Sequence, residues 1–205
     1  MPVFGFVSKQ YSYSMDNGIA VFDEFDASGC GITSDMLTML PRRMKVLGKF
    51  DISDNEIDSL TYLPPELSVG SFHCGWNRIQ TLEGLGCYLD SSFFVPTFTV
   101  EKDFNCQANK LKNLKGLPTP FNISGTFNCS MNQITSLYDL PPNFSCKDFD
   151  CSENQLTTLM NYRNFNTIHV NGSFYCFDNS QLRVGAIMHG LPASLYDACT
   201  IRKAN

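Results

Sequence analysis

The sequence is poor in charge and has no long apolar run. Only 17% of its 205 residues are charged, and the formal net charge is -5. A general nucleic-acid binder needs a basic stripe, so this composition argues against direct nucleic-acid binding. No segment approaches the roughly 18 consecutive apolar residues that cross a membrane. We therefore expect neither nucleic-acid binding nor a membrane span.

Catalytic and targeting motifs are also missing. The three histidines, His73, His169 and His189, are far apart in the chain, and there is no glycine-rich phosphate loop, HExxH or G-x-S-x-G. The first residues, MPVFGFVSKQYSYS, lack the basic start and apolar core of a secretion signal. We expect an intracellular protein that is not an enzyme and binds no cofactor. An enzyme with its chemistry in a terminal cap, or a metal protein, is the alternative of another class.

An internal repeat fills most of the chain. The segment FDCSENQLTTL begins at Phe149 and has Phe, Cys, Asn, Leu and Leu at offsets 0, 2, 5, 7 and 10. The same offsets recur from Phe127, Phe104, Phe72 and Phe50, with looser copies from Phe25 and Phe174. All intervals between successive repeat phenylalanines, except the longer one from Phe72 to Phe104, fall within a period of about 20–29 residues. Such periods are typical of solenoids, in which stacked units bury one continuous core.

Cysteine is abundant, but the nine residues are not spaced like a disulfide or zinc framework. Five share the position two residues after the repeat Phe: Cys74, Cys106, Cys129, Cys151 and Cys176. In a strand, that offset puts Phe and Cys on the same inward face. Small buried thiols are ordinary core residues, so we expect reduced cysteines. Zinc sites favour close pairs, whereas each of these cysteines belongs to a different repeat unit, so we predict no metal.

One polar residue recurs inside the apolar pattern. Six units have an asparagine five residues after the repeat Phe: Asn55, Asn77, Asn109, Asn132, Asn154 and Asn179. Where a short strand turns, buried backbone groups need partners, and an amide side chain offers both a donor and an acceptor. We interpret these residues as a structural ladder of asparagines.

The repeat F-x-C-x-x-N-x-[LI]-x-x-L, followed by LPPEL, LPTPF or LPPNF, resembles the leucine-rich repeats. It is most similar to the short bacterial and phage versions, over residues 22–182. The resemblance implies a leucine-rich-repeat horseshoe with a short parallel β-sheet on the concave face. It also implies a protein partner and a place in the cytoplasm of a bacterium or an infected host cell. The prolines predict extended segments on the convex side.

The chain divides into three parts. Residues 1–21 are predicted to form an N-terminal cap, residues 22–182 a solenoid of about seven units, and residues 183–205 a C-terminal cap, because terminal units expose apolar faces. Helical turns are expected at 33–40 and from Ala193. The solenoid has an insertion at 87–101, whose segment SSFFVPTFTV (91–100) either adds a strand on the convex side or pairs with another chain. Local packing is the interpretation we favour, because exposed apolar edges are usually suppressed.

The outward side of the predicted strands is acidic. Positions one before, one after and three after each repeat Phe point away from the core. They hold one base, Lys49, and six acids: Glu24, Asp26, Asp51, Asp103, Asp148 and Asp150. One interpretation is that solvated strand faces simply favour acidic residues. The other, which we favour by analogy with leucine-rich repeats, is that this face docks a basic patch of a protein partner.

Aromatic side chains lie close to this acidic face. Trp76, the only tryptophan, comes one residue after a strand and is either an interface anchor or packed on a neighbour. The predicted partner-binding residues are Asp51, His73, Trp76, Asp103, Asn105, Asn128, Asp148, Asp150 and Tyr175. We hypothesise a non-enzymatic adaptor or inhibitor. The alternative is a phage-encoded acidic decoy that occupies the basic groove of a nucleic-acid enzyme, with binding that weakens steeply as salt rises.

Overall fold

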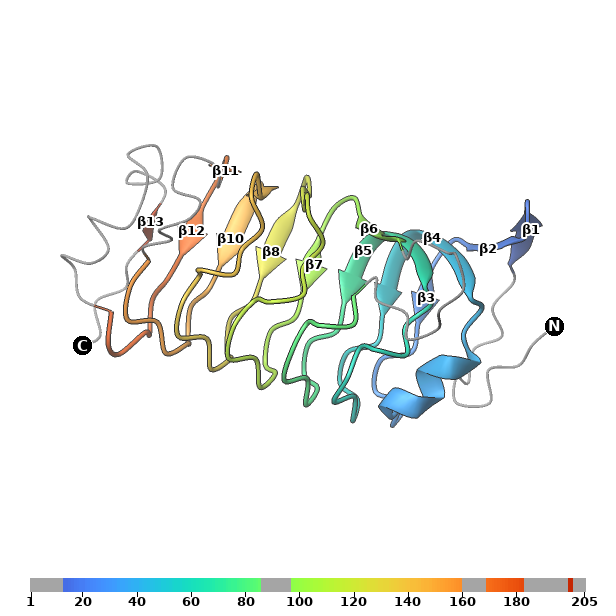
Figure 1. Ribbon diagram of the computed structural model, residues 1–205, viewed down its shortest axis with the longest axis horizontal. Coiled ribbons are helices and arrows are strands. Elements are labelled where there is room, and N and C mark those ends of the chain that lie inside the picture. Colours follow the sequence, from blue (N-terminus) through green and yellow to red (C-terminus); the bar gives the residue numbers. More distant parts are fainter. Residues whose placement is uncertain (1–12, 86–96, 160–168, 183–198, 201–205) are drawn as a thin grey trace.

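The chain winds into a row of stacked coils (Figure 1), each contributing parallel strands to one long sheet. The computed structural model describes residues 13–85, 97–159, 169–182 and 199–200. The predicted solenoid is confirmed, because the strands of successive repeats pair in parallel and in register. Among the described residues, no helix is long and apolar enough to span a membrane.

The described elements are short. In chain order they are β1 (Ser14–Asp16), β2 (Ile19–Phe22), β3 (Phe25–Asp26), the 3-10 helix η1 (Ser34–Met39), β4 (Arg43–Asp51), β5 (Glu66–His73), β6 (Thr97–Val100), β7 (Phe104–Asn105), β8 (Thr126–Asn128), β9 (Ser145–Cys146), β10 (Asp148–Asp150), β11 (His169–Val170), β12 (Phe174–Tyr175) and β13 (Cys199–Thr200).

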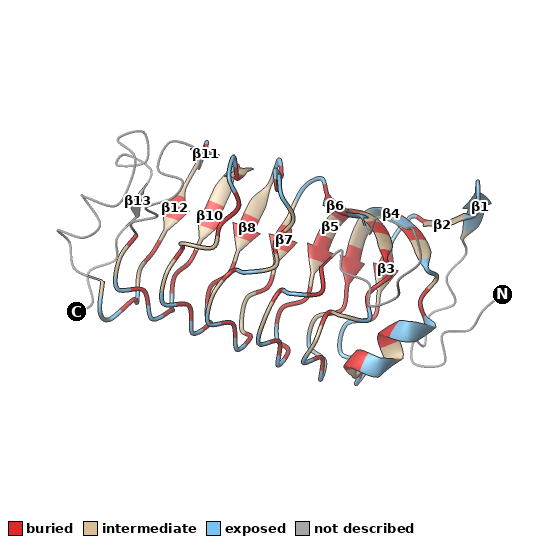
Figure 2. Cartoon of the chain, in the orientation of Figure 1, coloured by how far each residue is buried: buried red, intermediate tan, exposed pale blue. Residues whose placement is uncertain are grey.

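The repeat phenylalanines form a continuous stack in the core. Each pairs with the equivalent Phe of the next turn, from Phe25 to Phe174, and all are buried. Neighbouring rings are parallel, as for Phe50 and Phe72, whose centroids are 5.5 Å apart with an interplanar angle of 5°. Burying one such side chain stabilises the fold by about 1.5–3 kcal/mol. Figure 2 shows these buried residues running through every turn.

A second ladder of strands lies on the return path, before each repeat Phe. It includes the first halves of β4 and β5, and β6, and continues with β9 paired to β11. Its rings pack edge-on against the central stack, as Phe144 does on Phe127 at 5.2 Å and 87°. The sequence predicts extended segments here, and the structure organises them into paired strands. The apolar-x-apolar triplets MKV, LSV, FTV and FSC are the signal for this ladder.

The inserted segment contributes to the same ladder. β6 pairs with Glu66–Val69 of β5, so Thr97–Val100 occupies the position that Glu66–Val69 has in the preceding turn. These residues therefore belong to the regular repeat, and the extra length of this unit precedes Thr97. Residues 86–96 lie outside the described residues.

A β-hairpin closes the N-terminal end. β1 and β2 are antiparallel, joined at Asn17 and Gly18, whose φ angles are 49° and 80°. Two positive φ values in a two-residue turn suit Asn-Gly, and this dipeptide is the sequence signal for the hairpin. β2 then pairs in parallel with β4 and continues the solenoid.

The predicted helical segment at 33–40 is confirmed in part. Residues Ser34–Met39 form a 3-10 helix, and Thr33 is its N-cap residue. The Thr33 hydroxyl makes no capping bond to the backbone and donates to the Asp35 carboxylate. At the other end β13 pairs with β12, while the helix predicted from Ala193 lies outside the described residues.

Candidate functional site

Each ladder asparagine joins two turns of the solenoid. The Nδ2 group of Asn77 donates to the carbonyls of Ile52 in the preceding turn, at 2.9 Å, and of Cys74 and Gly75 in its own. Its Oδ1 accepts the backbone N–H of Ile57 at 2.9 Å. Equivalent bonds are made by Asn55, Asn109, Asn132, Asn154 and Asn179. These amides hold backbone groups that would otherwise be unpaired.

The strand face, formed by the positions one before, one after and three after each repeat Phe, has a second ladder of polar side chains. The residue one after the repeat Phe uses a side-chain oxygen to accept the backbone N–H two residues on, at 2.9–3.1 Å. Five residues do so: Asp26, Asp51, Asn105, Asn128 and Asp150. Such local bonds are Asx turns, which end a strand by satisfying its next donor. Sequence reasoning missed them, although the recurring F-[DN]-x-[SQ] was the signal.

Two further carboxylates accept backbone N–H groups of the following turn, close to the start of its strand. Asp103 Oδ1 accepts the N–H of Thr126 at 2.8 Å, and Asp148 Oδ1 accepts the N–H of Ser173 at 2.7 Å, each in the following turn. The preceding residues are glycines, and a Cβ on Gly125 would lie 2.2 Å from Asp103 Oδ1. Much of the acidity of the strand face therefore serves the backbone.

His73 and Tyr175 are the exceptions in the position one after the repeat Phe. Neither has a carboxylate or amide with which to form an Asx turn. Both side chains are half-buried on the strand face, on β5 and β12. The Asx turn that explains the other five residues therefore does not explain these two.

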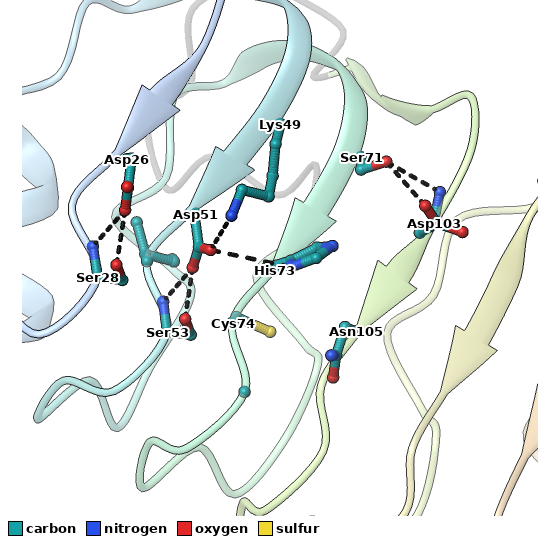
Figure 3. A network of polar contacts seen from close by, with 12 residues as sticks. Asp26, Ser28, Lys49, Asp51, Ser53, Ser71, His73, Cys74, Asp103 and Asn105 are labelled. Atoms are coloured by element: carbon teal, nitrogen blue, oxygen red, sulfur yellow. Dashed lines mark hydrogen bonds and ion pairs between the residues drawn. The ribbon is translucent and has the colours of Figure 1, made fainter.

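Asp51 is the centre of the polar network in Figure 3. Its carboxylate accepts Lys49 Nζ at 2.8 Å and the Ser53 N–H at 2.9 Å, and its Oδ2 lies 3.9 Å from His73 Nδ1. The sequence places Asp51 on an exposed face, but it is only 5% exposed. This expectation is wrong because the neighbouring Lys49, Ser53 and His73 side chains surround the carboxylate.

Burial and these partners set the charges of the network. Burial alone raises the pKa of Asp51, but the hydrogen bonds from Lys49 and Ser53 outweigh it and hold the pKa below its ordinary 3.8. Burial lowers the pKa of His73 below its ordinary 6.5; Asp51 opposes this shift and Lys49 adds to it. At neutral pH the network is an ion pair between Lys49 and Asp51 beside an uncharged imidazole.

Trp76 lies at the corner where the strand face meets the turn edge. We define the turn edge as the positions four, six and eight residues after each repeat Phe, which are mainly exposed. Trp76 is 53% exposed and has a left-handed φ of 55°. The bulky residues Trp76 and Met131 both occupy the first row of this edge, and both are among the exposed large apolar side chains of the described residues.

The cysteine ladder is interior. Cys74, Cys106, Cys129, Cys151 and Cys176 are buried and free, and the Sγ atoms of Cys129 and Cys151 each donate to a carbonyl of the next turn at 3.3 Å. Burial raises the pKa of the Cys74, Cys106 and Cys129 thiols. Within the described ranges, no group of three or more His, Cys, Asp or Glu residues is arranged to hold a metal ion.

The fold and this site together define a parallel β-solenoid with an internal asparagine ladder and a polar strand face. Comparison of the chain with protein-family models, with curated proteins and with solved structures found no match.

Proposed function

We propose that the chain is a non-enzymatic, intracellular protein-binding module of the leucine-rich-repeat type, whose partner docks on the strand face. The repeat period, the parallel strands and the asparagine ladder support this class. The horseshoe curvature, with the strand face concave, is part of the proposal.

The observation that carries this proposal is the identity of His73 and Tyr175. Five other turns use the same position for an Asx turn, which gives the strand end a backbone acceptor. A turn that gives up this bond loses about 0.5–1.5 kcal/mol of stability. His and Tyr present rings there instead, and Tyr is among the residues enriched in binding hot spots. The use of a ring in place of an Asx-turn residue at these two positions is explained if the rings contact another molecule.

The negative charge of the strand face favours a partner with a basic surface, and we expect the electrostatic attraction between them to be moderate. Asp51 is neutralised by Lys49, and Asp148 lies 3.8 Å from Lys147. The four remaining acids, Glu24, Asp26, Asp103 and Asp150, keep the face negative, and an oxygen of each of the three aspartates accepts a backbone N–H group. Charge of this kind favours association rate and orientation more than affinity.

Site-specific cross-linking in host cells tests the proposal. A photoreactive phenylalanine analogue replaces Tyr175 in one variant and Thr99 in the control. Thr99 is exposed on β6, in the other ladder. We expect position 175, and not position 99, to cross-link a discrete protein.

Purified components then measure the contribution of each ring. We expect His73→Ala and Tyr175→Ala each to weaken binding of the captured protein about tenfold or more, with Thr99→Ala as the control. Replacing Asp148 or Asp150 is a poorer test, because it also removes a backbone bond. Equal cross-linking from both positions, or unchanged affinity in both ring variants, would reject the strand face as the binding surface.

A further inference from the structure

The turn edge has an unusual order of charges around Trp76. The turn before Trp76 presents three acids, the turn with Trp76 is central, and the turn after it presents two lysines. In order along the edge, the residues are Asp54, Glu56 and Asp58; Trp76, Arg78 and Gln80; Ala108, Lys110 and Lys112. All are exposed except the half-buried Ala108. The acidic and basic rows are therefore equally distant from the tryptophan, on opposite sides.

Hydrogen bonds between turns keep these rows in register. The backbone N–H of Arg78 donates to Ile57 O at 2.8 Å, and that of Lys110 donates to Ile79 O at 2.9 Å. Backbones paired in this way are about 4.8 Å apart. Glu56, Arg78 and Lys110 consequently occupy equivalent positions in three successive turns.

We propose that the turn edge is the contact surface of a homodimer. In this dimer a two-fold axis lies in the interface and runs along the turn that contains Trp76 and Arg78. Rotation about this axis reverses the order of the turns between the two copies, but each residue keeps its position within its turn. Glu56 of one copy then faces Lys110 of the other, Asp58 faces Lys112, and Trp76 and Arg78 lie against their own symmetry mates. Arg78 Nη1 is 3.4 Å from Glu56 Oε2 of its own chain, and this ion pair offsets the repulsion between the two arginines. A self-complementary patch of this kind is what an isologous interface requires.

The sizes of the side chains on the turn edge are also complementary under this two-fold rotation. Met131 lies two turns after Trp76 and is 37% exposed, and its symmetry position, two turns before, is the exposed Gly29. Gln133 likewise faces Gly31, where a Cβ would meet no atom within 4 Å. The large residues on one half of the edge thus face glycines on the other half.

The backbone at Trp76 gives an independent reason for an external contact. The first row of the turn edge has a left-handed φ in every turn from Gly29 to Asp178. A bulky residue is disfavoured in this conformation, and strained residues often mark functional positions. The backbone of Trp76 is held in this conformation by hydrogen bonds to Gln107 and Asn55 of the neighbouring turns, but its side chain remains 53% exposed.

The dimer is expected to be weak. Five turns and three alternate positions cover an area of about 20 by 13 Å. This is less than the roughly 800 Å² per partner of a standard interface. We therefore expect concentration-dependent association that weakens as salt screens the exposed Glu56–Lys110 pairs.

Charge exchange tests the pairing directly, by sedimentation velocity of the full chain over about 10 µM to 1 mM. Glu56→Lys and Lys110→Glu are each expected to weaken self-association about tenfold or more, because like charges then face each other. An equal mixture of the two variants is expected to form a heterodimer, and the double variant to recover the homodimer. Glu101→Lys, with the same change in charge on another exposed surface, is the control and should associate like the unaltered chain.

Trp76 supplies a second readout, since it is the only tryptophan of the chain. Its emission is expected to shift to shorter wavelength as the unaltered chain associates. Trp76→Asn, which suits the left-handed backbone at this position better, is expected to abolish association with no loss of thermal stability. A monomer throughout the concentration range, or a mixture that behaves as the sum of its two parts, would overturn the proposal. Neither outcome affects cross-linking from position 175, so this proposal and the partner-binding function fail separately.

Discussion

The carboxylate of Asp148 accepts the backbone N–H of Ser173, one full turn further along the solenoid, at 2.7 Å. The sequence pattern assigns Asp148 to a binding surface, but in the structure its carboxylate connects two coils of the solenoid. This connection depends on Gly172, because a Cβ at that position would lie 2.4 Å from Asp148 Oδ1. The same arrangement recurs at Asp103 and Gly125.

Gly172→Ala is expected to destabilise the fold by about 1–3 kcal/mol, because the added methyl group displaces the carboxylate and leaves the Ser173 N–H unpaired. Chemical denaturation measures the change. Asp148→Ala should cost a similar amount, and the double variant should cost little more than either single one, because both remove the same bond. Additive effects would show that the glycine and the carboxylate act separately.

Asn132→Ala is expected to lower the free energy of unfolding by at least about 1–3 kcal/mol. The change removes the acceptor of the Leu111 N–H and the donor to the Cys106, Cys129 and Ser130 carbonyls. Asn171→Ala, at an exposed position, is the matched control. Equal denaturation midpoints for the two variants would remove the structural explanation of the asparagine ladder.

Acid is expected to destabilise the chain through His73. Burial depresses the pKa of this imidazole in the folded state, so the unfolded state binds a proton more readily. The contribution of His73 is fully present above its ordinary pKa of 6.5, and it decreases as pH falls below that value towards the lower folded pKa. Thermal melts of the unaltered chain and of His73→Gln should therefore diverge below about pH 6.5. Parallel curves down to pH 5 would contradict the depressed pKa.

The cysteines are expected to be free but protected. In denaturant without reductant, an alkylating reagent should modify all nine. In the folded protein, Cys74, Cys106, Cys129 and Cys151 should resist it, because they are buried and burial disfavours the reactive thiolate. Intact-mass measurement counts the modified thiols in both states. Unmodified cysteines in denaturant would instead indicate disulfides and an oxidising compartment.

The repeat was predictable where a residue type recurs at a fixed offset. Phe127 and Asn132 recur with the period of the coil, and each fills one kind of environment that every turn recreates. The apolar triplets before each Phe recur less strictly, from MKV to FSC, and the sequence predicts only extended segments there. Pairing into a second ladder depends on neighbouring turns, which lie a whole repeat unit away in the chain.

The strand face was harder to interpret because alternation fixes only the direction of a side chain. Alternation predicts that Asp51 points outward, but the covering by Lys49, Ser53 and His73 comes from two adjacent turns. Equally, the charge order around Trp76 is hidden in the sequence, where Glu56 and Lys110 belong to repeat units that are not consecutive.

The solenoid, its repeat unit and the inward positions of Phe, Cys and Asn were predictable from the sequence, because they follow from local periodicity and the need to bury apolar surface. Which acids serve the backbone, as Asp148 does, and which turn-edge residues lie in line with Trp76 became evident from the stacked coils alone. Hydrogen bonds and charges between turns depend on distances of a few ångströms. Those distances exist only once the coils are stacked.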